Sequence, residues 1–459
     1  MSELLFRSAT ETAELIRHGM SGSAELVRAQ LDRIRTVNPA VNALIEVHAE
    51  QALDAADKAD RAVRRDEATH GLHGVPISIK EAFGVAGFRS TWGNPGWAEN
   101  RSDRDATVVS RLTGAGAIIV GTTNVAAMLA DFGQTDNPVY GRTVNPWDAA
   151  RAAGGSTGGG AAAVAAGLSF LDYGSDLAGS VRIPAAFCGV YGLKPTVGIV
   201  PGTGFQPPGP PAPPSERTYQ VAFGPLARSA GDIRAAIRRT AGPEPPQSHA
   251  LRWALPAPRH RRLADFRVRY VLDHPAAPVN SDVGDALSDA LDGLARAGVT
   301  LMEGWPDGVD PVADVTSFGA HLSLYFAHLG QPTDLSLPDA VEQEQHRMSA
   351  RQAWQDCLTS TADVFLCPTV SVVAIRHDDR PFDDRTIDTG RGALPYRNLP
   401  FWIAAASLTG LPALSAPVGG RLPVGMQVVG PLFEDDTAIT FAELAADVIG
   451  GYRPPGDPS

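Results

Sequence analysis

Two serines and one lysine are the residues of this chain whose types and settings could perform covalent chemistry. Ser156 and Ser180 lie in glycine-rich turns within residues 154–184, which read GGSTGGGAAAVAAGLSFLDYGSDLAGSVRIP. Lys80 lies far upstream, at the end of VPISIK. A serine on such a turn is a candidate nucleophile, because exposed backbone N–H groups beside it could stabilise an oxyanion.

A serine hydroxyl needs a base, and lysine is the candidate base here. The 11 histidines lie in no recognisable catalytic context. Of 39 basic residues only three are lysines: Lys58, Lys80 and Lys194. Burial can deprotonate a lysine but not an arginine. Lys80 ends an apolar run, where we expect burial; Lys58 reads as a solvated helix residue and Lys194 as structural.

The segments that must position these residues alternate between strand and helix patterns. Short β-branched or apolar runs predict strands at VPISIK, AIIVG (117–121) and LSFLDY (168–173). Helical spacing covers 105–116 and 158–167. This alternation predicts an α/β fold with a largely covered sheet. We expect residues 1–65 to form an N-terminal helical segment packed on the core, and 66–459 to form one compact unit with a variable segment at about 200–330.

Composition narrows the classes of function. The formal net charge is -12 and no sustained basic stripe exists, so we expect no nucleic-acid partner. No apolar run approaches membrane-spanning length and the N-terminus has no signal-peptide core, which predicts a cytoplasmic protein. Cys188, Cys357 and Cys367 lack metal-ligand spacing and read as reduced structural thiols. We expect neither a metal nor a cofactor.

A rival interpretation makes Ser156 the nucleophile. Gly154 to Gly158 formally matches G-x-S-x-G, the nucleophile elbow of α/β-hydrolases. That elbow must follow a buried strand, whereas this one follows the polar NPWDAARAA. Ser180 does follow a strand-like run, so the pattern favours Ser180.

The chain resembles the amidase signature family of Ser–cis-Ser–Lys hydrolases. The resemblance spans roughly residues 70 to 432, in the family's order, and rests on GLHGVPISIKEAF, TDNPVYGRTVNPWD, GGSTGGGAAAVAAG, GSDLAGSVRIPAAFCGVYGLKPT, GPLARSAGDI and LTGLPALSAPVGGRLPVGMQVVGP. It implies a mixed, mostly covered central β-sheet flanked by helices on both faces.

The resemblance also implies roles for individual residues. Ser180 would be the nucleophile that forms an acyl-enzyme, Ser156 the proton relay that follows a cis peptide bond, and Lys80 the general base. The oxyanion hole would be the backbone N–H groups of Leu177, Ala178, Gly179 and Ser180. Thr157 and the pair Asp176 and Arg182 would support the nucleophile loop.

Departures from the family pattern surround this trio. Ala178 stands where glycine is usual, Thr157 where a second serine is common, and Glu81 where aspartate is frequent. Gly121-Thr122-Thr123-Asn124 replaces the common G-K-T-N. Ala178 would be strained if its φ had to be positive; we expect a permissive site there.

The substrate is less defined than the chemistry. Leu129, Phe132, Phe205 and Trp402 could line an acyl pocket, and the loop 201–214, which holds seven prolines, could border it. The leading hypothesis is an amidohydrolase that cleaves a small carboxamide or N-acyl amide. One alternative is acyl transfer to an amine from the same acyl-enzyme. The other is the glutaminase subunit of a tRNA-dependent amidotransferase, although the Tyr-Asp-Gly-x-Arg segment of such subunits is missing from the sequence. A homodimer is possible.

Overall fold

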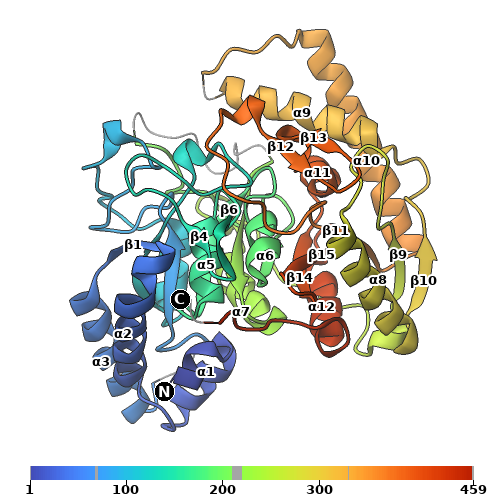
Figure 1. The fold of residues 1–459 in the computed structure, drawn as a ribbon. Coiled ribbons are helices and arrows are strands. Elements are labelled where there is room, and N and C mark those ends of the chain that lie inside the picture. The colour runs from blue at the N-terminus through green and yellow to red at the C-terminus, as the bar shows by residue number, and fades with distance from the viewer. Residues whose placement is uncertain (1, 68–70, 209–219, 329, 457–459) are drawn as a thin grey trace.

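The computed structural model describes residues 2–67, 71–208, 220–328 and 330–456. Within them, eight strands form a mixed sheet in the order β10-β9-β11-β15-β14-β7-β8-β6 (Figure 1). Neighbouring strands are antiparallel except for the parallel pairs β9–β10 and β9–β11. The strands are β6 (Leu171–Asp176), β7 (Tyr191–Lys194), β8 (Ala222–Ala227), β9 (Arg267–Tyr270), β10 (Thr300–Glu303), β11 (Val364–Pro368), β14 (Ala413–Val418) and β15 (Val424–Val429).

A second sheet carries Lys80. It has the order β1-β3-β2, with β1 (Leu44–Val47), β2 (Pro76–Lys80) and β3 (Ile118–Thr123). β2 runs beside β6, and the Phe170 N–H just before β6 donates to the Pro76 carbonyl at 3.3 Å. Two further pairs are β4 (Val144–Asn145) with β5 (Asp148–Ala152), and β12 (Thr386–Asp388) with β13 (Ala393–Pro395).

Helices cover both faces of the large sheet. On β8, Leu226 packs in a cluster with α5 (Gly158–Ala165) and α6 (Arg182–Cys188). Phe223 and Ala227, which point to the opposite face because side chains alternate along a strand, pack in the cluster with α7 (Ala230–Thr240). The prediction of an α/β fold with a covered mixed sheet is therefore confirmed.

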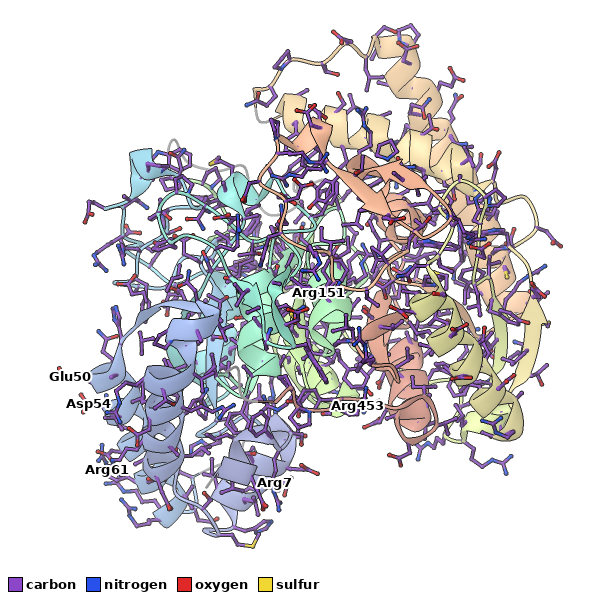
Figure 2. All side chains as sticks on the ribbon, viewed as in Figure 1. Arg7, Glu50, Asp54, Arg61, Arg151 and Arg453 are labelled. Atoms are coloured by element: carbon purple, nitrogen blue, oxygen red, sulfur yellow. The ribbon has the colours of Figure 1, made fainter. Side chains whose placement is uncertain are left out.

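The remaining helices surround this core. They are α1 (Ala9–Arg17), α2 (Ser23–Val41), α3 (Ala49–Arg64), α4 (Thr107–Gly114), α8 (Ser281–Arg296), α9 (Pro311–His328), α10 (Leu337–Ser360), α11 (Phe401–Thr409) and α12 (Asp435–Ile449). Short 3-10 turns lie at Ser2–Phe6, Pro95–Trp97, Ala127–Leu129, Gln247–His249, Leu263–Asp265, Phe382–Asp384 and Tyr396–Asn398. On α3, Glu50, Asp54 and Arg61 are exposed at the edge of the molecule (Figure 2). None of the described helices is long and apolar enough to cross a bilayer.

The N-terminal 65 residues, where we expect a helical segment, contain α1, α2 and α3 and also one strand. β1 interrupts the helices and pairs with β3. The Asn38 side chain fixes this exit from α2, because its Oδ1 accepts the N–H groups of Ala43 and Leu44, each at 2.9 Å. The proline-rich loop expected at 201–214 lies outside the described residues beyond position 208.

Candidate active site

Lys80 is the last residue of β2 and is completely buried. Its Nζ donates to Oγ of Ser156 at 2.7 Å, to Oγ1 of Thr157 at 2.8 Å and to Oγ of Ser175 at 3.0 Å. A neutral amine has two N–H groups and one lone pair, so one of these hydroxyls must donate to Nζ when lysine is neutral. The cluster is therefore arranged to exchange a proton between Lys80 and a hydroxyl.

Burial changes the charge balance of this lysine. It lowers the pKa of Lys80 to about 7, while the negative charges of Asp172 and Asp176 oppose that shift. A base with a pKa near neutrality is half deprotonated at pH 7, which suits general base catalysis.

Ser156 lies in a turn in which the preceding position, 155, has room only for glycine. The Gly155–Ser156 peptide bond is cis, as the resemblance implies. A Cβ at Gly155 would lie 2.3 Å from the Asp131 carbonyl oxygen and 2.5 Å from that of Gln134. Ser156 itself is buried, and α5 begins two residues later. The close backbone packing holds the Ser156 hydroxyl against Lys80.

Ser180 lies in the loop between β6 and α6, beside the Ser156 turn. The Thr157 N–H donates to the Ser180 carbonyl oxygen at 3.2 Å, which joins the two serine-bearing turns. Ser180 is 7% exposed, against 1% for Ser156 and none for Lys80. Of the three, Ser180 is the residue with the most access to a substrate.

An ion pair joins the two ends of the Ser180 loop. Arg182 donates to Asp176 through Nη2 at 2.8 Å and through Nε at 3.0 Å, and both side chains are fully buried. Burial alone would raise the pKa of Asp176, but the charge of Arg182 and its hydrogen bonds lower it. Arg182 also donates to the Ser407 hydroxyl at 2.7 Å and to the Gln427 side-chain oxygen at 2.7 Å. These contacts support the expected bracing role of Asp176 and Arg182.

The four N–H groups predicted to form an oxyanion hole differ in their hydrogen bonding within the protein. The Gly179 N–H donates to Asp176 Oδ1 at 2.9 Å, so it is already paired within the loop. The N–H groups of Leu177, Ala178 and Ser180 have no acceptor among the described residues. The oxyanion hole stays a prediction, and these three N–H groups are the ones in it without a partner in the protein.

The loop also explains why alanine is tolerated at position 178. The positive φ falls on Gly179, at +87°, and Ala178 is not among the positive-φ residues. A Cβ at Gly179 would lie 2.7 Å from Ile183 Cδ1. Glycine is therefore required at position 179 and not at position 178. Alanine at 178 carries no backbone strain from a positive φ, in line with the expectation that this position tolerates it.

The four predicted pocket residues occupy different surroundings. Phe132 stacks on Tyr396 at 5.4 Å between ring centroids, and its carbonyl accepts the Gly155 N–H. Leu129 has a φ of +59° and is partly buried. Phe205 packs in an aromatic cluster with Phe83, Trp92 and Phe223.

Trp402 is a core residue. It is 2% exposed, stacks on Trp305 and donates its indole N–H to Ser371 at 3.1 Å. These contacts account for the side chain without a ligand, so the suggestion that it lines a pocket finds no support in the packing.

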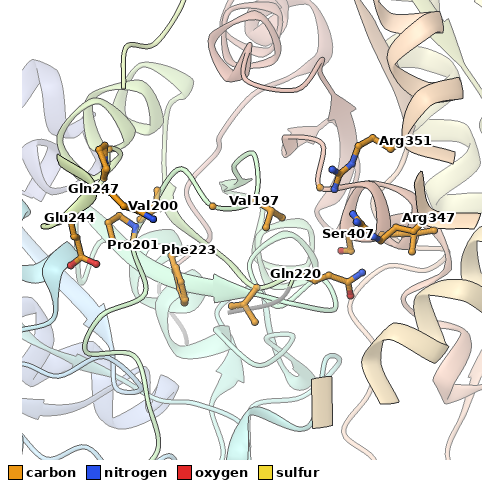
Figure 3. Close-up of a pocket in the computed structure, with 16 residues that line it drawn as sticks. Val197, Val200, Pro201, Gln220, Phe223, Glu244, Gln247, Arg347, Arg351 and Ser407 are labelled. Carbon is orange, nitrogen blue, oxygen red and sulfur yellow. The ribbon is translucent and has the colours of Figure 1, made fainter. Parts of the chain in front are cut away.

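A cavity of about 410 Å³ is lined by residues that follow β7, precede β14 and start β8, and Figure 3 shows this lining. The antiparallel register brings the end of β6 to the start of β8, and the end of β7 to the start of β14. Segments next to these ends line the cavity, together with Glu244 and Gln247 on one side and Arg347 on the other. Ser407 contributes to this wall and also accepts from Arg182, so the cavity adjoins the bracing network.

Comparison with known proteins identifies the family. The chain matches the amidase family over residues 25–323 and 339–439. The chain belongs to the amidase signature family. It is 36% identical over 308 residues to the acylamidase of Rhodococcus erythropolis, which covers 66% of this chain and 62% of that protein. It is 32% identical to the indoleacetamide hydrolase of Bradyrhizobium diazoefficiens, covering 95% of this chain and 85% of that protein.

Solved structures agree with this assignment. A 6-aminohexanoate cyclic dimer hydrolase in complex with its substrate has a TM-score of 0.79 at 25% identity, covering 98% of this chain and 99% of that one. A bacterial aryl acylamidase has the same fold, with a TM-score of 0.82 at 22% identity, covering 96% of each chain. The predicted family is confirmed, and this amidase is a hydrolase that acts on amide C–N bonds.

Sequence reasoning missed three polar residues of this amidase. Ser175 is a third hydroxyl on Lys80, and Asp172 is a buried carboxylate beside it. An acidic residue within the apolar run LSFLDY was the signal that could have found Asp172. Gln220, with a φ of +63° and no hydrogen-bond partner for its buried amide among the described residues, lines the cavity and carried no such signal.

Proposed function

We propose that this amidase hydrolyses a small carboxamide or N-acyl amide through an acyl-enzyme on Ser180, with Ser156 as proton relay and Lys80 as general base. The observation that carries the proposal is the hydrogen bond between the buried Lys80 Nζ and the Ser156 hydroxyl, at 2.7 Å, in the turn that adjoins Ser180. A buried neutral lysine can activate serine without histidine.

Acylation follows from this arrangement. Ser180 Oγ attacks the amide carbonyl carbon and gives its proton to Ser156 Oγ. At the same time Ser156 Oγ gives its own proton to the neutral Lys80 Nζ. The negative oxygen of the tetrahedral intermediate is placed for the N–H groups of Leu177, Ala178 and Ser180. The proton then returns through Ser156 to the amide nitrogen, the C–N bond breaks and the amine leaves.

Deacylation repeats these transfers with water as the nucleophile. Water gives a proton through Ser156 to Lys80, attacks the acyl carbon and releases the carboxylic acid, and Ser180 Oγ regains its proton. An amine that replaced water would instead form a new amide. Hydrolysis and acyl transfer therefore share one intermediate and differ only in the second nucleophile.

The test is a screen of primary amides, anilides and amino-acid amides, with intact-protein mass spectrometry on samples quenched early in turnover. We expect an acyl adduct on Ser180 in the native chain and none in Ser180→Ala. Added hydroxylamine would divert the acyl group to a hydroxamate and so measure the share of acyl transfer. Turnover of an amide by correctly folded Ser180→Ala at the native rate would reject the proposal.

A further inference from the structure

Asp172 is a completely buried carboxylate on β6 that the proposed mechanism does not use. Its Oδ2 accepts from the Ser78 hydroxyl at 2.7 Å and from the Thr123 hydroxyl at 3.0 Å. Its Oδ1 has no hydrogen-bond partner among the described residues. Burying a carboxylate with an unpaired oxygen is costly, so its presence calls for a compensating charge or a function.

Both donors to Asp172 adjoin Lys80. Ser78 precedes Lys80 by two residues on β2 and so lies on the same face of that strand. Thr123 is the residue that pairs with Lys80 in the register between β2 and β3. The hydrogen bonds to Ser78 and Thr123 therefore hold the carboxylate against the lysine's own strand pair.

The packing leaves Asp172 little freedom to move away. A Cβ at Gly160, on α5, would lie 2.2 Å from Asp172 Oδ1. The same Cβ would lie 3.1 Å from the Thr157 methyl group, and the Thr157 hydroxyl is itself bonded to Lys80. Asp172 thus lies in the same tightly packed layer as the lysine's hydroxyl acceptors.

Other charged groups near Lys80 have partners of their own. Asp176, also on β6, is paired with Arg182 of α6, and Lys194 of β7 acts on that pair. Glu81, which directly follows β2, accepts the N–H groups of Thr91 and Trp92 and the Tyr140 hydroxyl proton.

The strand β3 and the helix α5, which both pack against β2, carry no charge. β3 reads IIVGTT and α5 reads GGGAAAVA, so neither has a titratable side chain. The charges of two carboxylates, Asp172 and Asp176, act on Lys80, and of these only Asp176 is paired with an arginine. Burial raises the pKa of Asp172 to about 7, while the hydrogen bonds from Ser78 and Thr123 and the charge of Lys80 favour its ionised form.

We propose that Asp172 is a positioning residue whose negative charge stabilises the ammonium form of Lys80 while that lysine holds the proton taken from Ser180 through Ser156. This role rests on the function proposed above. Asp172 accepts no proton in the step: the proton passes from Ser180 Oγ to Ser156 Oγ and from Ser156 Oγ to Lys80 Nζ. The carboxylate lowers the energy of the ion that results.

The sign of the expected effect follows from this charge. A carboxylate beside a lysine raises the pKa of the lysine, so its removal must lower that pKa. In Asp172→Asn, the acid limb of the rate profile should move to lower pH by about one unit or more, because opposite charges at short range shift pKa values by roughly 1–3 units. The rate on the alkaline plateau should fall, because Lys80 becomes a weaker base.

The experiment measures the pH dependence of two reactions, phosphonylation of Ser180 by a fluorophosphonate and hydrolysis of an amide. Asp172→Asn keeps the volume and the acceptor for Ser78 and Thr123. The matched control is Asp232→Asn, another fully buried aspartate, which accepts the Ala9 and Thr10 N–H groups at 2.9 and 2.8 Å. The control should lower thermal stability without moving the acid limb.

The outcomes separate this proposal from the function. The native chain should show an acid limb in its rate profile. If Asp172→Asn leaves that limb at the same pH, or moves it to higher pH, the role of Asp172 is overturned and the proposed function is not. A native chain that neither reacts with the probe at Ser180 nor cleaves an amide overturns the function, and this role with it. If Asp172→Asn does not fold, Ser78→Ala removes one hydrogen bond to the carboxylate and should give a smaller shift in the same direction; no shift there counts against the proposal.

Discussion

Lys80 and Lys194 form a natural comparison within the molecule. Each is the last residue of a strand, β2 for Lys80 and β7 for Lys194, and each is completely buried. Burial lowers the pKa of both to about 7. Lys80 nevertheless reaches three hydroxyls, whereas the Nζ of Lys194 donates to the Pro195 carbonyl oxygen at 3.0 Å.

The difference shows that a lowered pKa is not sufficient for catalysis. A carbonyl oxygen has no proton to give, so Lys194 has nothing to deprotonate at the partner it contacts. A hydroxyl can both donate and accept, so Lys80 can exchange a proton with Ser156. We infer that burial lowers the pKa of both lysines enough for either to act as a base. Only Lys80 lies beside hydroxyl groups from which it can take a proton.

The largest effect in this comparison should come from Ser180→Ala. It removes the proposed nucleophilic oxygen and leaves both lysines in place. We expect kcat/KM for amide hydrolysis to fall by about 10⁴-fold or more, as loss of the nucleophile does in serine hydrolases. Steady-state kinetics with circular dichroism as the fold control checks this, and a loss below about tenfold would remove Ser180 from its role.

A paired substitution separates the relay from a mere contact. Ser156 and Ser175 both accept from Lys80, at 2.7 and 3.0 Å, but only Ser156 is assigned proton transfer. Ser156→Ala should cost about 10²–10⁴-fold in kcat, the usual range for losing a general acid–base step. Ser175→Ala should cost clearly less. Equal losses in the two variants would mean that Ser156 acts only by filling space around Lys80.

Much of this site could be predicted from the sequence, because its residues sit in contiguous motifs. Lys80 ends β2, and Ser156 and Ser180 lie two residues before α5 and α6. The Gly155–Ser156 turn has close backbone contacts that only glycine permits. The pairing of the Gly179 N–H with Asp176 was not predictable, since it depends on how one side chain turns within its own loop.

The cavity beside the site was beyond sequence reasoning for another reason. Its walls come from segments more than 100 residues apart, such as Val197 to Pro201 and Arg347 to Arg351, which only the folded sheet brings together. The strand β1 was missed because four residues between two long helices carry little pattern of their own. Trp402 could not be assigned to core or pocket until its neighbours were known.

A smaller effect should show that Lys194 is neutral in the folded chain although it is not proposed as a base. With a pKa of about 7 when folded and about 10.4 when unfolded, a buried lysine leaves the unfolded chain holding more protons between these values. The free energy of unfolding should therefore rise with pH across this window, and the penalty for a protonated buried lysine should persist below it.

Lys194→Met removes the Lys194 share of this dependence, so unfolding stability should rise less steeply between pH 7 and pH 10. Urea unfolding at several pH values measures the slope. Lys58→Met is the control, because Lys58 lies on α3 and its side chain is exposed to solvent. A slope that is unchanged in Lys194→Met would show that this lysine is not neutral in the folded chain.

The smallest effect should come from Ala178→Gly. Ala178 has no positive φ, and the left-handed residue of the loop is Gly179. Restoring the family's usual glycine should change kcat/KM by less than about threefold and cost up to about 1 kcal/mol of stability through added freedom in the unfolded chain. A gain of tenfold or more in kcat would show that the Ala178 methyl group obstructs the substrate.

The comparison of Lys80→Met with Lys194→Met tests the central claim most directly. Both variants replace a buried lysine at a strand end with an uncharged side chain of similar length, so differences in kcat/KM report what the lysine contacts. We predict that Lys80→Met loses about 10³-fold or more in kcat/KM at pH 8, while Lys194→Met, measured as folded protein, keeps activity within about tenfold. Equal losses, or a Lys80→Met variant that retains near-native activity, would contradict the assignment of Lys80 as the base.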